Sequence, residues 1–324
     1  MVKKKPSVSV GSGDPKDIPE ELPMSIMRVL VEMYYDFQKT RIEAGNRALM
    51  NAERNNITEE DLEKYGVKDI FDAAKKFEGA IQKRIEADLP TKAIFKNYLD
   101  SIQGIGPILT AGCMAYVEDV SRFDKVSALW QYSGYGQNTF CPDCSTDKTK
   151  AWTYVDVEYE GADGKKKKVK RLRPSPTCNK CGHDTENARQ QNSAGFQSNW
   201  NPKIKVLFWK AATSFMKQQS AKSGYRKLYE QYKRDLRSKF PSKIKDKNGK
   251  TKYNDGHINN MALRKVSKIF MQHVWIVWRQ IDGHPISKPY GAIGANHTYL
   301  EPFVDKPNKE FDKILKEIQK NLKP

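Results

Sequence analysis

Four of the five cysteines stand in two Cys-x-x-Cys pairs, one formed by Cys141 and Cys144 and the other by Cys178 and Cys181. A turn with this spacing directs two thiolates toward one point, and two such turns complete a tetrahedral zinc site. His183 is a further candidate ligand, although four thiolates already satisfy the metal. Because four thiolates leave no coordination position for water or substrate, we expect a structural rather than a catalytic zinc ion.

A dense run of cations lies between the two cysteine pairs. Residues 152–160 alternate apolar and acidic side chains, which predicts a strand, and Gly-Ala-Asp-Gly at 161–164 predicts a turn. The returning basic strand would complete a β-hairpin inside the zinc module. A metal-bound hairpin with so many cations is expected to contact nucleic-acid phosphates. The cations of this run are Lys165, Lys166, Lys167, Lys168, Lys170, Arg171 and Arg173.

The composition favours a polyanionic partner. The chain has 324 residues, a formal net charge of +18 and a pI of about 9.5. A basic surface kept only for solubility is the alternative, but clustered cations favour DNA or RNA. No apolar run approaches the roughly 20 residues of a membrane helix, and no secretion signal follows the start. We therefore expect a protein of the cytoplasm, associated with the nucleoid, that has no membrane partner.

Residues 1–23 predict a disordered basic tail, and residues 24–90 predict a helical arm. Apolar residues recur there at spacings of three and four, a capping box is predicted at Thr58, and Pro90 ends the last helix. A helical hairpin or coiled coil, which could join two copies into a homo-oligomer, and an ordinary bundle both fit this pattern. The acids of the second long helix are expected on its solvated face, namely Asp69, Asp72, Glu78 and Glu86.

Residues 91–140 predict a helix-hairpin-helix. A helix over 91–103 leads into Gly104-Ile105-Gly106, and the next helix starts at Pro107, a residue suited to a first helical turn. Glycines permit a tight turn whose N–H groups can face a DNA phosphate. We therefore expect these three residues to contact DNA.

The fold class predicted for the whole chain is mainly α. A helical arm and a helix-hairpin-helix-type helical domain are expected, with the zinc-ribbon β-hairpin of residues 141–183 as an insert. The helical domain should resume over 184–301, and 302–324 should form a charged tail that ends in a short charged helix. Within that domain, residues 221–252 carry twelve Lys or Arg against three acids. No helix for reading base edges is evident, so a phosphate-binding role is favoured.

Three stretches before the insert, at 101–111, 120–124 and 129–135, resemble the C-terminal domain of the insertion-sequence 110/116/902 transposases. They read SIQGIGPILTA, VSRFD and LWQYSGY. After the insert, NSAG at 192–195 and the helix from Asn201 match the family more loosely, and so does the late helix at 261–279. The resemblance covers about 101–135 and 190–280.

The resemblance implies a DNA recombinase in which a serine, here Ser193, attacks the DNA backbone. In the family an N-terminal RuvC-like domain supplies four acids that bind Mg²⁺, a coiled coil joins the domains, and a structured RNA can guide target choice. The residues before the arm contain no strand that could begin such a domain. The family's metal-binding acids therefore have no counterparts here, and Mg²⁺ is expected only if the protein is catalytic.

Three functions follow from these patterns, and they leave open whether the protein is an enzyme. The first is a DNA-binding protein related to the transposase C-terminal domain, acting in transposition or recombination or as an accessory relative. The second is an active recombinase that uses Ser193 with a metal site supplied elsewhere. The third is a zinc-ribbon protein that binds RNA.

Overall fold

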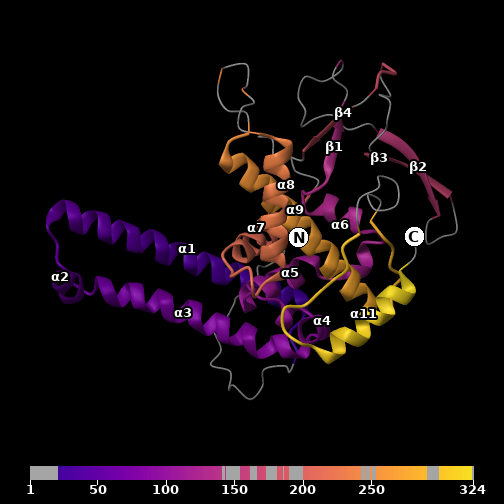
Figure 1. Cartoon of the computed structure of the whole chain (residues 1–324). Coiled ribbons are helices and arrows are strands. Elements are labelled where there is room, and N and C mark those ends of the chain that lie inside the picture. The colour runs from indigo at the N-terminus through magenta and orange to yellow at the C-terminus, as the bar shows by residue number, and fades with distance from the viewer. Residues whose placement is uncertain are drawn as a thin grey trace, which may run out of the picture. The chain divides into compact units, whose positions relative to one another are not determined.

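The computed structural model describes residues 21–140, 143, 154–160, 166–172, 181–184, 186–189, 200–241, 245, 249, 253–289 and 299–322. The chain is mainly helical, as its sequence predicts, and divides into two compact units, Met1–Lys92 and Ala93–Pro324 (Figure 1). Most of the predicted N-terminal tail lies outside the described residues. None of the described helices combines the length and the apolar character that crossing a membrane requires.

The first unit is a helical hairpin. Helices α1 (Met24–Asn55) and α3 (Val67–Asp88) lie side by side, and the short α2 (Glu59–Lys64) connects them (Figure 1). The predicted capping box starts α2: the Asp61 N–H donates to Thr58 Oγ1 at 3.2 Å, and the Thr58 N–H donates to Asp61 Oδ2 at 3.0 Å. Of the two arrangements that the sequence left open, the structure therefore has the hairpin.

One acid of α3 is not where the sequence places it. Glu78 was expected on the solvated face, but its side chain is buried and accepts hydrogen bonds from Arg41 of α1. The rings of Phe37 and Phe77 stack across the same two helices, with centroids 5.3 Å apart. An ion pair between facing helices can bury a carboxylate that helical periodicity alone assigns to the surface.

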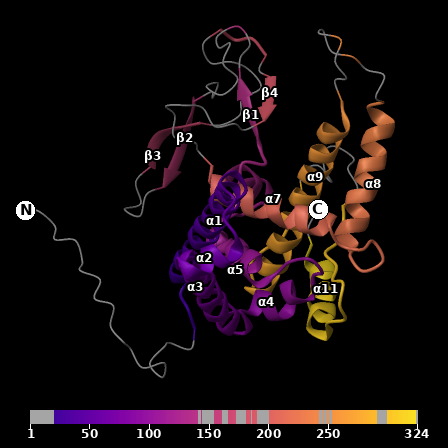
Figure 2. The ribbon, with the colours of Figure 1, turned by 90° about the vertical axis from the view of Figure 1, so that its left-hand side faces the viewer.

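The second unit is built around four helices: α5 (Pro107–Val117), α7 (Pro202–Met216), α8 (Gly224–Lys239) and α9 (Asp255–Ile281). Helix α9 packs against both α7 and α8, and α5 packs against α7 (Figures 1 and 2). Nearly every residue of α5 is buried. The centre of the core is aromatic, because the rings of Phe208, Phe215 and Tyr225 all contact Phe270.

The start of this unit corrects a prediction. A single helix over 91–103 was expected, but α4 (Ala93–Asn97) ends early and a short 3₁₀ turn (Leu99–Ser101) follows. Tyr98, between them, has φ −143° and ψ −64° and is fully buried. The Ser101 carbonyl then accepts the N–H groups of Asp305 and Lys306. The helix does not continue to residue 103, because Tyr98 is buried and the Ser101 carbonyl bonds to these distant residues instead.

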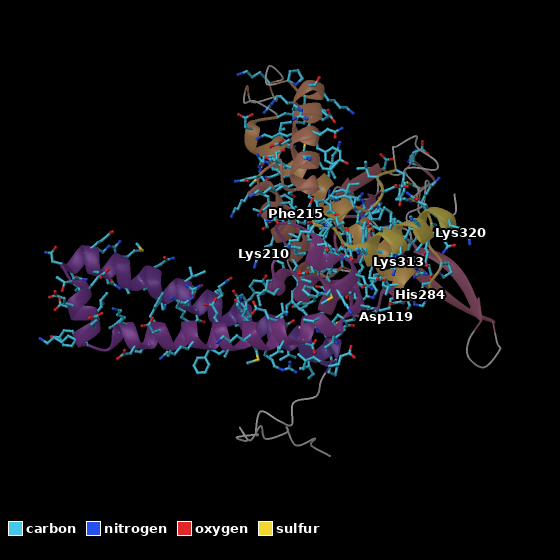
Figure 3. All side chains as sticks on the ribbon, turned by 60° about the horizontal axis from the view of Figure 1, so that its bottom comes forward. Asp119, Lys210, Phe215, His284, Lys313 and Lys320 are labelled. Carbon is cyan, nitrogen blue, oxygen red and sulfur yellow. The ribbon has the colours of Figure 1, made fainter. Side chains whose placement is uncertain are left out.

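The C-terminal segment is more than a charged tail. Helix α11 (Lys309–Asn321) buries Phe311 and Ile318, and the Phe311 ring stacks on Tyr98 with centroids 5.5 Å apart. Lys313 and Lys320 lie on the same helix (Figure 3). The last residues of the chain thereby help to hold the segment that precedes the Gly104 turn.

A buried chain of hydrogen bonds joins three parts of the second unit. The hydroxyls of Tyr98 and Tyr225 are 2.9 Å apart, and Tyr225 Oη is 2.7 Å from His273 Nδ1. His273 Nε2 is 3.1 Å from the Leu300 carbonyl. That carbonyl can only accept, so Nε2 carries a proton. Burial lowers the pKa of this imidazole to about 3, so the ring is neutral near pH 7 and Nδ1 then accepts from Tyr225.

Two short antiparallel ladders lie between α6 (Val126–Tyr132) and α7. Strand β1 (Gln137–Phe140) pairs with β4 (Glu186–Arg189), which brings the two ends of the segment between them together. Strand β2 (Tyr154–Glu160) pairs with β3 (Lys166–Leu172), at the positions expected for the hairpin. The β1–β4 ladder was not predicted, and it gives this segment the geometry of an insert.

Candidate nucleic-acid interface

The predicted hairpin residues form a tight turn at the start of α5. Gly104 has φ +96°, a conformation that favours glycine, and an added Cβ would lie 2.7 Å from the Gln218 side chain. Gly106 is the N-cap of α5, with φ −90°, and nothing lies within 4 Å of its Cβ position. Pro107 occupies the first turn, as expected. Of the two glycines, only Gly104 is therefore required by the backbone.

Contacts from three elements hold this turn. The Ser214 hydroxyl of α7 donates to the Gly104 carbonyl. The Asp305 carboxylate accepts the Gln103 N–H and the Gly224 N–H, each at 2.7 Å, so it joins the turn to the start of α8. Among the described residues, the N–H groups of Ile105 and Gly106 have no protein acceptor. These two groups are the ones that a phosphate could use.

Helix α7 carries lysines beside the turn. Lys210 and Lys217 are exposed and lie about one helical turn on either side of Ser214, whereas Phe215 is buried (Figure 3). Asn201 caps the helix, because its Oδ1 accepts the Lys203 N–H at 3.0 Å. Partial burial lowers the pKa of Lys210 from its ordinary value. Both lysines therefore lie within four residues of Ser214, the residue of α7 that binds the Gly104 turn.

Helix α8 contributes a second basic surface. An open groove of about 780 Å³ runs along α8, with Met216 and Asp255 at its edges. Four cations of α8 line it against one carboxylate of the same helix, Glu230. Their spacings of three, four and seven residues place them on one side of the helix. We call this surface the α8 groove, and its cations are Arg226, Lys233, Arg234 and Arg237.

The positive charge of the chain belongs almost entirely to the second unit. Residues 1–92 carry 16 Lys or Arg against 17 Asp or Glu, whereas residues 93–324 carry 41 against 22, a net charge of +19. Within 201–239, which contains α7 and α8, eleven cations stand against two acids. A polyanion would therefore be attracted to the second unit and not to the arm.

The strand register places the basic run of the insert along β3. Lys166, Lys168 and Lys170 stand at the positions paired with Glu160, Glu158 and Asp156 of β2. Lys167 and Arg171 stand at the positions paired with Tyr159 and Val155, and Lys165 and Arg173 lie outside the described residues. The contact of this run with nucleic acid stays a prediction.

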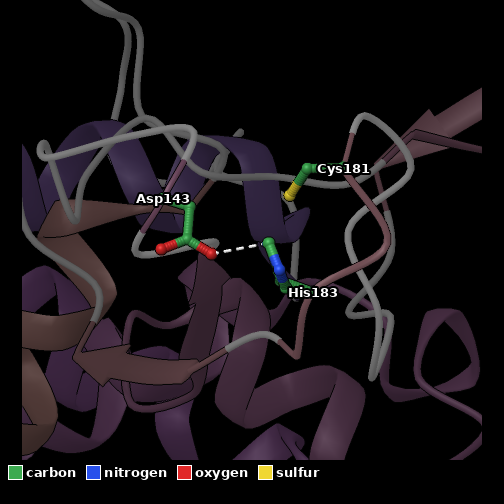
Figure 4. A group of neighbouring side chains, drawn as sticks. All are labelled: Asp143, Cys181 and His183. Atoms are coloured by element: carbon green, nitrogen blue, oxygen red, sulfur yellow. Dashed lines mark ion pairs between the residues drawn. The ribbon is translucent and has the colours of Figure 1, made fainter.

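The cysteine pairs can be placed only in part. Cys181 is described and exposed, whereas Cys141, Cys144 and Cys178 lie outside the described residues. Asp143, from within the first pair, lies beside Cys181 and His183, and one ligand atom of each residue falls within 4.8 Å of the others (Figure 4). His183 Nδ1 is 2.7 Å from Asp143 Oδ2. One residue from each Cys-x-x-Cys segment, Asp143 and Cys181, therefore lies at this point, and a cysteine sulfur is a ligand that suits zinc.

The proposed nucleophile cannot be placed. Ser193 lies outside the described residues, as do its neighbours from 190 to 199. Across the part of the chain that the structure describes, Asp143, Cys181 and His183 are the one cluster of three His, Cys, Asp or Glu residues with converging ligand atoms. The role of Ser193 stays a prediction. No protein-family model and no curated protein matches this chain.

The sequence predicted the basic segment 221–252 but did not indicate which of its residues line one groove. The cations of the α8 groove recur at 226, 233, 234 and 237, a spacing that helical periodicity could have selected. The position of Lys210 and Lys217 beside Gly104 had no sequence signal, because it depends on the packing of α7 against α5.

The two glycines of the turn should respond differently to alanine. Gly104→Ala should lower the free energy of unfolding by about 1–3 kcal/mol, because alanine at positive φ is strained and its Cβ crowds Gln218. Gly106→Ala should change it by less than about 0.5 kcal/mol, since its backbone is extended and its Cβ position is open. Urea denaturation of both variants measures the difference, and equal losses would contradict this account of the turn.

Proposed function

We propose that this protein binds DNA through its second unit. The observation that carries the proposal is the basic segment 201–239, which has eleven cations and two acids. Ser214 of this segment donates directly to the Gly104 carbonyl, and Asp305 links Gly224 of the segment to Gln103. Free N–H groups and lysines around one turn suit a phosphate, because both stabilise negative charge. Contacts of this kind position a duplex without reading its sequence.

The resemblance to the C-terminal domain of the insertion-sequence 110/116/902 transposases supports the same proposal. The part of the resemblance before the insert begins at Ser101 and includes the Gly104 turn. The part after the insert includes the start of α7. We propose that the protein acts in transposition or recombination, or as an accessory relative, with zinc holding the insert. An active recombinase using Ser193 is the alternative that this resemblance implies.

A salt titration tests the proposal. Fluorescence anisotropy with a 30-base-pair duplex should show an affinity that falls steeply between 50 and 200 mM salt, because each neutralised phosphate releases counterions. For six to ten phosphate contacts the expected loss is about 10³–10⁵-fold. The same titration with duplex RNA and with single-stranded RNA tests the alternative partner. An affinity for DNA that does not change over this range would end the proposal, and a clear preference for RNA would favour the third function.

A further inference from the structure

Two of the four cations of the α8 groove are already bound to the protein. Arg226 donates to the Met216 carbonyl and, from Nε, to Glu230 Oε1 at 2.7 Å. Arg237 donates to the Tyr253 carbonyl at 2.8 Å and to the Asp255 carboxylate. These guanidinium groups are therefore fixed by backbone carbonyls and carboxylates, and they shape the groove.

The other two cations have no such partner. Lys233 and Arg234 are exposed, and neither forms an ion pair with a carboxylate among the described residues. The Lys233 ammonium lies 5.8 Å from the centre of the Tyr229 ring. Arg234 acts on the Glu230 carboxylate only at longer range, behind the direct bonds of that carboxylate to Arg226 and Ser220. Two adjacent exposed cations without a direct carboxylate partner can bind a ligand's negative charge.

The floor of the groove indicates how a nucleic acid would be recognised. Tyr229 is only 4% exposed, and its hydroxyl donates to Asn259 Oδ1 at 2.5 Å. Its ring is thus covered by the protein and cannot serve as a platform on which a base stacks. Stacking on exposed aromatic rings is the usual way in which proteins hold unpaired bases. The groove therefore suits phosphates better than bases.

The last turn of α7 connects the groove to the Gly104 turn. Ser214 donates to the Gly104 carbonyl, and two residues later the Met216 carbonyl accepts from Arg226. Asp305 adds a second connection, because its carboxylate holds both Gln103 and the first residue of α8, Gly224. The two candidate phosphate contacts are therefore parts of one packed unit and can bind one duplex together.

We propose that the α8 groove binds the phosphate backbone of DNA, with Lys233 and Arg234 making the contacts and without reading the bases. This inference rests on the proposed function and adds a second contact site to the Gly104 turn. Arg226 and Arg237 keep the groove in shape and are positioning residues.

The test is the double variant K233Q/R234Q, with K75Q/K76Q as its matched control. The control also removes two adjacent exposed cations from a helix, but from α3 in the first unit. Each lost phosphate contact lowers the slope of log affinity against log salt by about 0.9, so K233Q/R234Q should lower it by about 2. Between 50 and 200 mM salt, wild-type affinity should consequently fall about tenfold more than that of K233Q/R234Q, and the control should match the wild type.

A third variant separates charge from structure. Asp255 does not serve for this, because its carboxylate accepts from Arg237 and so helps to shape the groove. Asp235 of α8 is exposed and forms no ion pair among the described residues. D235N should bind DNA more tightly, an increase that a merely structural role of the groove would not produce. The loss in K233Q/R234Q should also be equal on two duplexes of unrelated sequence, because phosphates carry no base information. Circular dichroism and melting temperatures confirm that each variant is folded.

The outcomes separate this inference from the proposed function. If the wild type binds DNA with strong salt dependence but K233Q/R234Q behaves like K75Q/K76Q, the groove is not a contact site and the proposed function stands. If the affinity lost in K233Q/R234Q depends on the duplex sequence, or is lost for RNA alone, the groove does not bind the DNA phosphate backbone as proposed. If the wild type shows no salt-dependent binding, the proposed function fails and this inference fails with it.

Discussion

Chelating the predicted zinc should release one metal ion per chain and unfold the module of residues 141–183, while the helices keep their far-ultraviolet circular dichroism. The expected effect is large, because zinc binding in small modules supplies about 10 kcal/mol or more of folding free energy. Cys181 lies beside Asp143, a residue of the other Cys-x-x-Cys segment, and beside His183, a proximity that a shared ion would require. Metal analysis before and after chelation measures the stoichiometry.

The helices should survive because their core does not include the insert. Phe208, Phe215 and Phe270 pack together between α7 and α9, and α5 packs on α7. The segment between β1 and β4 begins and ends in one ladder, so its unfolding need not separate the helices on either side. A loss of most helical signal on chelation would contradict this separation.

Two cysteine variants provide the matched test. Cys181→Ala should lose zinc, because it removes one of the four predicted thiolates. Cys113→Ala should keep zinc, since Cys113 is fully buried in α5. Burial also raises the pKa of the Cys113 thiol far above its ordinary value, so this residue is not a thiolate ligand. Equal zinc content in the two variants would show that the cysteine pairs do not hold the metal.

Acidification should destabilise the second unit through His273. Burial lowers the pKa of this imidazole from 6.5 to about 3 in the folded protein. Above pH 6.5 the imidazole is neutral in both the folded and the unfolded chain, so the stability is fully present. As the pH falls from 6.5 toward 3, the unfolded chain binds a proton that the folded chain does not. The free energy of unfolding should therefore drop by about 1.4 kcal/mol per pH unit across this window.

Burial keeps His273 neutral in the folded protein, because loss of hydration lowers the pKa of the imidazole more than the hydrogen bond to Leu300 raises it. Nε2–H donates to the Leu300 carbonyl, and Nδ1 accepts from Tyr225, whose oxygen can accept from Tyr98. The imidazole is fully buried, and a protonated ring there would lose its hydration without gaining a carboxylate partner.

Urea denaturation at pH 6.5 and pH 5 measures this effect with little interference from carboxyl groups of ordinary pKa. His273→Gln cannot titrate, and its amide can both donate and accept, so its stability should change much less between the two pH values. His257→Gln replaces an exposed histidine of the same helix and should retain the wild-type loss. If His273→Gln and the wild type lose equal stability, His273 is not the responsible group.

The sequence by itself determined the helical segments that have a strong local signal. Thr58 starts α2 through its capping box, Pro107 and Pro202 stand in the first turns of α5 and α7, and Cys113, in an apolar helical stretch, is buried. These features follow from capping geometry and apolar periodicity, which operate within a few residues. The alternation of 152–160 likewise located β2.

Only the tertiary structure decided which charged side chains are available to a ligand. Whether a charged group is available depends on its partner, and the partner can be distant in sequence: Arg237 binds Asp255, 18 residues away, and Asp305 binds Gln103, 202 residues away. The same holds for Glu78, which an arginine 37 residues away buries. These pairs form where separate elements pack, because an electrostatic contact depends on the distance between two groups in space. The periodicity of one helix does not predict that distance.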